Sequence, residues 1–253
     1  MNQSVPAPHR IIDSDQAAIE RMEQRLTTRY TPSAAFPLQA WLLTEGNETP
    51  AKILDISGNG IGLLLEPDAL PAEGDAVQVR LRFGAHQQLL DGRVAQLRPE
   101  AAKAYCGVGL KFADLLTRKT YLQLLQPIAI GQSLRPVPAE QVLQNEPSLS
   151  KRSFRGDDQS LLTVWYDRSI NPTIQRFEFR TTEYFCQLDR SSGVLEIQSH
   201  ADSGAHEGKS SNPVFDISGT LQAEVRQLFR WTLPNLAAVV PDDVRAFLQH
   251  YAT

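Results

Sequence analysis

The chain has 253 residues, of which 42% are hydrophobic and 21% charged, and its formal net charge at pH 7 is −4. This length suits two domains, and the composition is ordinary for a soluble globular protein. The slightly acidic balance argues against DNA, RNA or a membrane surface as general partners, because these favour a basic excess. No apolar run approaches membrane-spanning length, and the N-terminus lacks the apolar core of a signal peptide, so we expect a cytoplasmic protein without a membrane span.

Residues 1–13 are polar and contain prolines, so we expect a flexible N-terminus. A helix is predicted to follow from residue 14 to about residue 26. Arginines recur at every fourth position here, at Arg21, Arg25 and Arg29, just before the first predicted strand. Their planar guanidinium groups suit phosphates and the O6/N7 edge of guanine. We take Arg25 and Arg29 as the main pair because they lie nearer the strand, with Arg21 as a possible accessory contact.

The next hundred residues contain short apolar segments separated by Gly- and Pro-containing turns. The clearest is 76–83, in which apolar and polar residues alternate, as expected for a strand with one buried face. The predicted strands are 38–43, 51–54, 61–65, 76–83, 89–97 and 105–112. Strands at this spacing suggest a closed or nearly closed antiparallel barrel. A helix with Leu115, Leu116, Leu122 and Leu125 on its apolar positions would cover it and end at Pro127.

The stretch Asp55-Ile56-Ser57-Gly58-Asn59-Gly60 joins two of these strands. Its glycines and asparagine allow positive φ and a tight reversal, which would present a carboxylate and a hydroxyl with little bulk around them. Taken alone, the stretch is better explained as an ordinary hairpin turn capped by Asp and Ser.

An Arg-x-x-x-Arg followed about 25 residues later by Asp-x-Ser-x-x-Gly resembles the PilZ domain, the bacterial cyclic di-GMP receptor family. The segment 106–112, Cys-Gly-Val-Gly-Leu-Lys-Phe, is similar to that family's last barrel strand. The resemblance covers roughly residues 20–126. It implies a six-stranded antiparallel barrel that binds cyclic di-GMP.

The resemblance also assigns roles to five residues. Asp55 would accept hydrogen bonds from N1–H and the N2 amino group of guanine, and Ser57 would add a neighbouring hydrogen bond. Gly60 would let the base approach the backbone closely. Arg25 and Arg29 would bind phosphate and the other guanine edge, or stack on a purine face. The alternative is that both arginines are surface charges at the end of a helix.

The rest of the chain is predicted to form a linker, residues 127–150, and a second domain of unassigned family, residues 151–253. In this domain we expect strands at 161–166, 176–181 and 194–198, with 184–188 as a candidate continuation of the second. Helices are expected at 220–231 and from Pro241 to Tyr251. The complete chain would thus be an α+β protein, mainly β. Two segments repeat parts of the motif: 189–193 is expected to be a plain hairpin turn, and 216–219 a helix cap.

Catalytic signals are few. His200 and His206 have no neighbouring cysteine cluster, and phosphate-binding loops, dinucleotide fingerprints and nucleophile elbows are missing. We therefore expect no enzyme, no metal site and no cofactor. Cys106 and Cys186 lie in apolar strands and should be buried free thiols, since a disulfide would require the two halves to touch.

Two functional hypotheses remain. In the first, the barrel binds cyclic di-GMP, and the second domain relays the signal to a protein partner. In the second, the barrel is a scaffold for a ligand-independent interaction adaptor. A titration with cyclic di-GMP would discriminate between them.

Overall fold

A computed structural model describes residues 28–67, 70–100, 102–157, 159–181, 184–199 and 221–252. The chain divides into two compact units. The first contains the described residues up to Pro32 and the range 37–125, and the second contains Ser33–Phe36 and the chain from Gln126 onward. The predicted N-terminal helix, Arg21 and Arg25, the histidines 200 and 206, and the segment 216–219 all lie outside the described residues.

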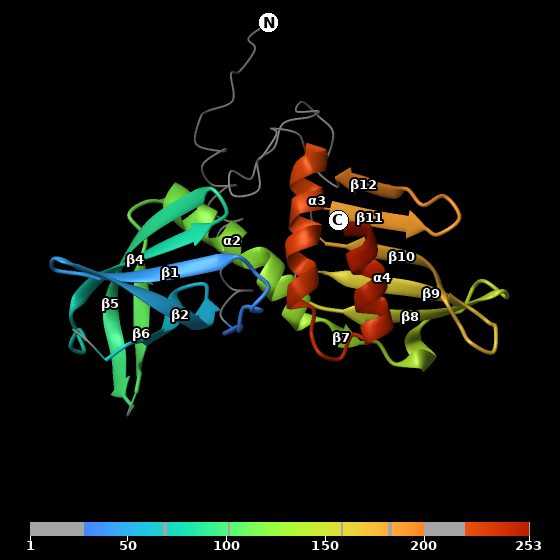
Figure 1. Cartoon of the computed structure of the whole chain (residues 1–253). Coiled ribbons are helices and arrows are strands. Elements are labelled where there is room, and N and C mark those ends of the chain that lie inside the picture. Colours follow the sequence, from blue (N-terminus) through green and yellow to red (C-terminus); the bar gives the residue numbers. More distant parts are fainter. Residues whose placement is uncertain are drawn as a thin grey trace, which may run out of the picture. The chain divides into compact units, whose positions relative to one another are not determined.

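The first unit is a closed barrel of six antiparallel strands, as predicted (Figure 1). The strands are β1 (Leu38–Thr44), β2 (Asn47–Ser57), β3 (Gly60–Leu65), β4 (Ala76–Phe83), β5 (His86–Pro99) and β6 (Ala104–Lys111). They are joined in the order β1-β2-β3-β6-β5-β4, and β4 closes onto β1. In β4 each second side chain, from Val77 to Phe83, is buried, because strand side chains alternate between the two faces. The interior is therefore an apolar core. The polar side chains of the motif at residues 55–60 must therefore point to the outside of the barrel.

Helix α2 (Leu115–Ser133) follows the barrel, and its first part belongs to the same unit. The prediction that this helix ends at Pro127 was wrong: Pro127 lies inside it, and Ile128 and Ile130 beyond it are almost completely buried. A proline inside a helix costs about 3 kcal/mol. Burying two isoleucine side chains contributes about 1.5–3 kcal/mol each, which together equals or exceeds that cost.

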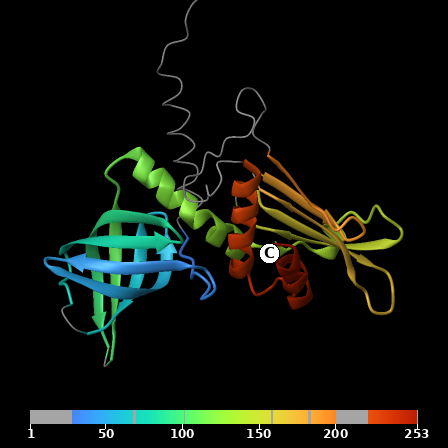
Figure 2. The same ribbon diagram turned by 45° about the horizontal axis from the view of Figure 1, so that its top comes forward.

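The second unit is a six-stranded antiparallel meander followed by helices (Figure 2). Its elements are β7 (Arg135–Pro136), η1 (Ala139–Gln141), β8 (Leu149–Arg155), β9 (Leu161–Asp167), β10 (Ile174–Arg180), β11 (Tyr184–Asp189), β12 (Leu195–Ser199), α3 (Leu221–Thr232), η2 (Leu233–Asn235) and α4 (Asp242–Ala252). Helices α3 and α4 cover one face of the sheet. Phe229 of α3 stacks on Phe177 of β10 with ring centroids 5.6 Å apart, and Phe247 of α4 meets the same ring edge-on. This aromatic cluster fixes the two helices on the sheet.

The predicted linker contains more structure than expected. The last turns of α2, the short strand β7 and the start of β8 all lie between residues 127 and 150. Strand β8 was not predicted, because its sequence Leu-Ser-Lys-Arg-Ser-Phe-Arg has few apolar residues. It forms because its backbone pairs with β9 along its whole length. Segment 184–188 is a strand of its own, and Asp189–Gly193 is the expected hairpin turn, with a positive φ at Gly193.

Both cysteines are buried free thiols, as predicted. Burial raises the pKa of Cys106 to about 11 and that of Cys186 to about 12. Because only the thiolate is nucleophilic, we expect neither to react with iodoacetamide at pH 8 until the chain is unfolded in guanidinium chloride. Rapid labelling of the folded chain would contradict this.

The same pKa values predict the sign of a pH effect on stability. Between pH 9 and 11 the folded chain keeps a proton on Cys106 that the unfolded chain loses, so the free energy of unfolding should fall as the pH rises through this window. Denaturant titrations at pH 8, 9 and 10 measure this fall. A Cys106→Ala variant should lose the part of it due to this thiol.

Candidate functional site

The motif residues lie at the end of the hairpin formed by β2 and β3. Asp55 and Ser57 belong to β2 itself, and only two residues, Gly58 and Asn59, form the turn. Asp55 pairs with Gly62 and Ser57 with Gly60 across the hairpin. Both side chains are directed away from the barrel interior, because Ile56 between them is completely buried in it.

Gly60 does not adopt the positive φ that a glycine allows: its φ lies outside the left-handed region. Space is the reason for a glycine here. A Cβ atom at Gly60 would lie 3.2 Å from the carbonyl oxygen of Val108 and 4.0 Å from Nη2 of Arg29. The residue therefore keeps the surface low beneath the Arg29 side chain.

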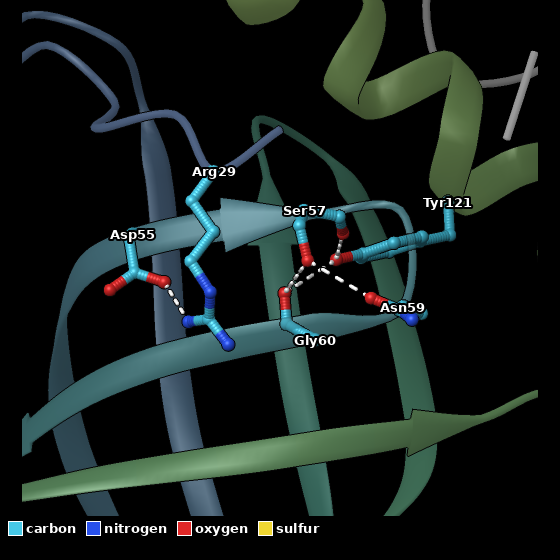
Figure 3. Close-up of polar contacts among 6 residues, drawn as sticks. All are labelled: Arg29, Asp55, Ser57, Asn59, Gly60 and Tyr121. Atoms are coloured by element: carbon cyan, nitrogen blue, oxygen red, sulfur yellow. Dashed lines mark hydrogen bonds and ion pairs between the residues drawn. The ribbon is translucent and has the colours of Figure 1, made fainter. Parts of the chain in front are cut away.

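Arg29 is held at this hairpin by the residue that follows it. Tyr30 and Ile56 exchange two backbone hydrogen bonds of 2.9 Å, which add the arginine segment to the edge of β2. The Arg29 guanidinium then donates to Oδ1 of Asp55 in an ion pair (Figure 3). The structure thus brings together two predicted site residues that stand 26 positions apart in the chain.

The ion pair is open to solvent. The side chain of Arg29 is 56% exposed, and that of Asp55 is 23% exposed. The hydrogen bond from Arg29 to Asp55 raises the pKa of the guanidinium further above its usual value, and the hydroxyl of Tyr105 acts in the same direction. The guanidinium fork of Arg29 has donors beyond the one that Oδ1 of Asp55 accepts.

Ser57 lies differently from its predicted role. It is 2% exposed, and its hydroxyl is within hydrogen-bond distance of the Asn59 side chain, at 3.2 Å, and of the Gly60 carbonyl, at 3.3 Å. These contacts brace the turn (Figure 3). A direct hydrogen bond from Ser57 to a ligand stays a prediction.

Two tyrosines near the motif were not among the predicted site residues. Tyr121 of α2 is completely buried, and its hydroxyl donates to the carbonyl oxygen of Ser57 at 2.6 Å. Burial raises the pKa of Tyr121 well above its usual value, so this donor keeps its proton. Tyr105 of β6 is partly exposed, and Arg98 lies over its ring at 5.9 Å. Neither tyrosine has a local sequence signal, because each reaches the site only through the fold.

The described residues contain no group of three or more His, Cys, Asp or Glu side chains placed to hold a metal ion. None of the helices in the described ranges is long and apolar enough to cross a bilayer.

Comparison with known proteins gives a family match for the N-terminal part of the chain. The family model of the PilZ domain matches residues 20–127. No curated protein matches the chain. Among solved structures, the Legionella uncharacterized protein Lpg0364 is similar at 18% identity and a TM-score of 0.27, over 39% of this chain and 90% of that one. The Borreliella burgdorferi PlzA protein, solved in complex with c-di-GMP, is similar at 13% identity and a TM-score of 0.35, over 69% of this chain and 86% of that one. The PilZ match spans residues 20–127, and the described part of that range forms the six-stranded barrel that the sequence predicted.

Proposed function

We propose that this chain is a cyclic di-GMP receptor whose ligand binds on the outer wall of the barrel, at the β2–β3 hairpin. One observation carries the proposal: Arg29 and Asp55 meet there on a surface kept low by glycine. The carboxylate supplies acceptors for the N1–H and N2 amino donors of guanine, and the guanidinium supplies a cation for a phosphate or for the O6/N7 edge. The PilZ family assignment supports the same ligand.

In this proposal the ligand binds where Arg29 and Asp55 already contact each other. Asp55 is engaged by Arg29 in the structure, so a guanine must share or replace that ion pair. The exchange is possible at low cost because the pair is exposed, and exposed ion pairs contribute only about 0–1 kcal/mol. Arg25 and Arg21 are proposed to complete the cationic side of the site, with Arg25 as the second main contact.

The proposal is tested by calorimetric titration of the full chain with cyclic di-GMP and, in parallel, with cyclic di-AMP. We expect micromolar or tighter binding of the guanine ligand and binding of the adenine ligand weaker by at least about a hundredfold. The reason is that a carboxylate aligned with guanine donors would face N1 of adenine, an acceptor, and the pairing would be lost. Absence of heat with either nucleotide would favour the adaptor hypothesis instead.

We further propose that the chain acts as a cytoplasmic binding protein, without catalysis, and that the second unit passes the signal to a protein partner. Two parts of the chain connect the site to that unit. Helix α2, which holds Ser57 through Tyr121, continues to Ser133. The segment after Arg29 enters the second unit at Ser33–Phe36, where the Ser33 N–H donates to the buried side chain of Asn235 at 2.9 Å.

The proposed relay predicts that cyclic di-GMP changes hydrogen exchange in the second unit, and that one substitution removes part of this change. If the ligand binds one arrangement of the Arg29 segment better than others, it shifts the population towards that arrangement. Hydrogen exchange should then change at residues 33–36 and 233–236 when cyclic di-GMP is added. In an Asn235→Ala variant we expect this change to vanish at 233–236 while binding at the barrel is retained. Unaltered exchange in the unsubstituted, ligand-saturated chain would contradict the relay but not the binding site.

A further inference from the structure

The sheet of the second unit has two edges, and one of them is protected against pairing with another strand. At that edge β7 is only two residues long and contains Pro136, whose nitrogen carries no hydrogen. Beyond β7, the side-chain amide of Gln144 bonds both the N–H and the carbonyl oxygen of Lys151, each at 2.8 Å. A side chain thus occupies backbone groups of β8 that a further strand would need.

The opposite edge, strand β12, has none of these protections (Figure 1). Among the described strands it pairs with β11 only. Its sequence, Leu-Glu-Ile-Gln-Ser, contains no proline, glycine or lysine, and its register with β11 is regular. Every second residue of an edge strand directs its backbone N–H and C=O away from the sheet. Within the part of the second unit that the structure describes, β12 is therefore a regular edge that can accept another strand.

The side chains of β12 also leave apolar surface at this edge. Leu195 and Ile197 pair with Leu188 and Cys186, which are buried on the face covered by helices α3 and α4. Leu195 and Ile197 lie on the same face but are only half-buried. Val194, immediately before the strand, is 60% exposed. A strand added to β12 would cover part of this aliphatic surface, which favours pairing.

The single charge in β12 does not oppose pairing. The Glu196 side chain accepts a hydrogen bond from Gln187, its partner on β11. This bond holds the carboxylate towards β11 and away from the open edge. Natural sheets often use a charged side chain to keep other strands from an edge, and here the charge is directed inwards along the sheet.

We propose that β12 is a homodimer interface: two copies of this chain pair antiparallel along β12, so that their sheets become one continuous sheet with α3 and α4 of both copies on the same side. This inference goes beyond the proposed function and does not depend on cyclic di-GMP. Because the other edge of each sheet is protected, pairing through β12 leaves no second open edge of this kind. The assembly should therefore stop at the dimer.

The sequence of β12 selects one register for this pairing. With Ile197 opposite the same residue of the second copy, all five residues of the strand are paired and Glu196 lies opposite Gln198. A shift of two residues would either place Glu196 opposite Glu196, a destabilising like-charge pair, or leave Leu195 unpaired. A shift of one residue would set the helix-covered face of one copy against the exposed face of the other.

This register can be tested by exchanging charges at two exposed positions. The lysine variant carries Glu196→Lys and Gln198→Lys, and the glutamate variant carries Gln198→Glu. Each variant alone would place two like-charge pairs across the interface, so its dimer dissociation constant should rise about tenfold. An equimolar mixture should form heterodimers at least as well as the unsubstituted chain, because every Lys then lies opposite a Glu. Sedimentation velocity of the full chain without nucleotide measures all four samples.

A matched control places the same charge change on the closed barrel. Gln87→Lys combined with Asp91→Lys alters exposed positions of β5 and should leave dimerisation within about twofold. A single strand pair is a small interface, so we expect a dissociation constant in the micromolar range, at about 1–100 μM. An unsubstituted chain that stays monomeric at several hundred micromolar, or that forms species larger than a dimer, would overturn the inference. Variants that dimerise unchanged, a mixture that restores nothing, or a control that is weakened equally would also overturn it.

Discussion

Replacing Asp55 with alanine is expected to remove most of the affinity for cyclic di-GMP. Truncating one partner of a desolvated, hydrogen-bonded charge pair costs about 2–5 kcal/mol, which is a loss of roughly thirtyfold to several thousandfold in the dissociation constant. In the complex the carboxylate would be covered by the base, so its hydrogen bonds to guanine would be shielded from water. Calorimetric titration of the variant beside the unsubstituted chain measures the loss.

The same substitution should change the free energy of unfolding very little. In the structure Asp55 is paired with Arg29 at an exposed position, and such pairs add about 0–1 kcal/mol to stability. The loss of binding can therefore be separated from loss of folding by comparing denaturant midpoints. Asp91, whose side chain accepts a hydrogen bond from Gln78 on the exposed wall of the barrel, provides the matched control. Asp91→Ala should bind normally, and an Asp55→Ala variant that also binds normally would remove the basis of the proposed site.

Replacing Arg29 tests the other half of the ion pair. Arg29→Ala should lower affinity to a similar extent, while Arg29→Lys keeps a positive charge but loses the planar fork. If the fork matters for a guanine edge or a phosphate, lysine should restore little of the affinity. Full rescue by lysine would show that Arg29 acts only through its charge.

The second large effect is expected at Tyr121. This side chain is completely buried, and its hydroxyl is bonded to the carbonyl oxygen of Ser57. Tyr121→Ala should lower the free energy of unfolding by about 3–5 kcal/mol, as for other large buried aromatic residues. Tyr121→Phe removes only the hydroxyl and should cost about 1–3 kcal/mol, because a buried acceptor loses its donor. Denaturant titration gives both values.

Tyr121→Phe should also weaken ligand binding, because Ser57 lies in the strand that carries Asp55. The phenylalanine variant keeps the packing of the ring against its neighbour Phe112, whose centroid lies 5.3 Å away, so the chain should still fold. Tyr105→Phe is the control for stability: its hydroxyl belongs to a partly exposed side chain, and its loss should stay within about 0.5 kcal/mol. A Tyr121→Phe variant as stable as the unsubstituted chain would show that the hydroxyl does not brace the hairpin.

The barrel and the position of its motif could be predicted from the amino-acid sequence alone. In strands such as β4, the alternation of apolar and polar residues indicates which side chains are buried. The turns that contain glycine and proline indicate where each strand ends. The resemblance carried by the arginine and aspartate motifs predicted that Arg29 and Asp55 belong to one site, and the structure brings them into contact. This information is local or lies in a short motif, so it can be read without knowing which segments are neighbours in space.

Other features depend on contacts between segments that are distant in the chain. Helix α2 passes through Pro127 because the isoleucines beyond it are buried, and β8 is a strand because β9 supplies its hydrogen-bond partners. Tyr121 reaches Ser57 from 64 positions away, and Gly60 meets the carbonyl oxygen of Val108 only when β6 pairs with β3. In each case the deciding free energy comes from burial or pairing between segments distant in the chain. This free energy cannot be predicted from the local pattern of residues, because the contacts that supply it form only when the chain folds.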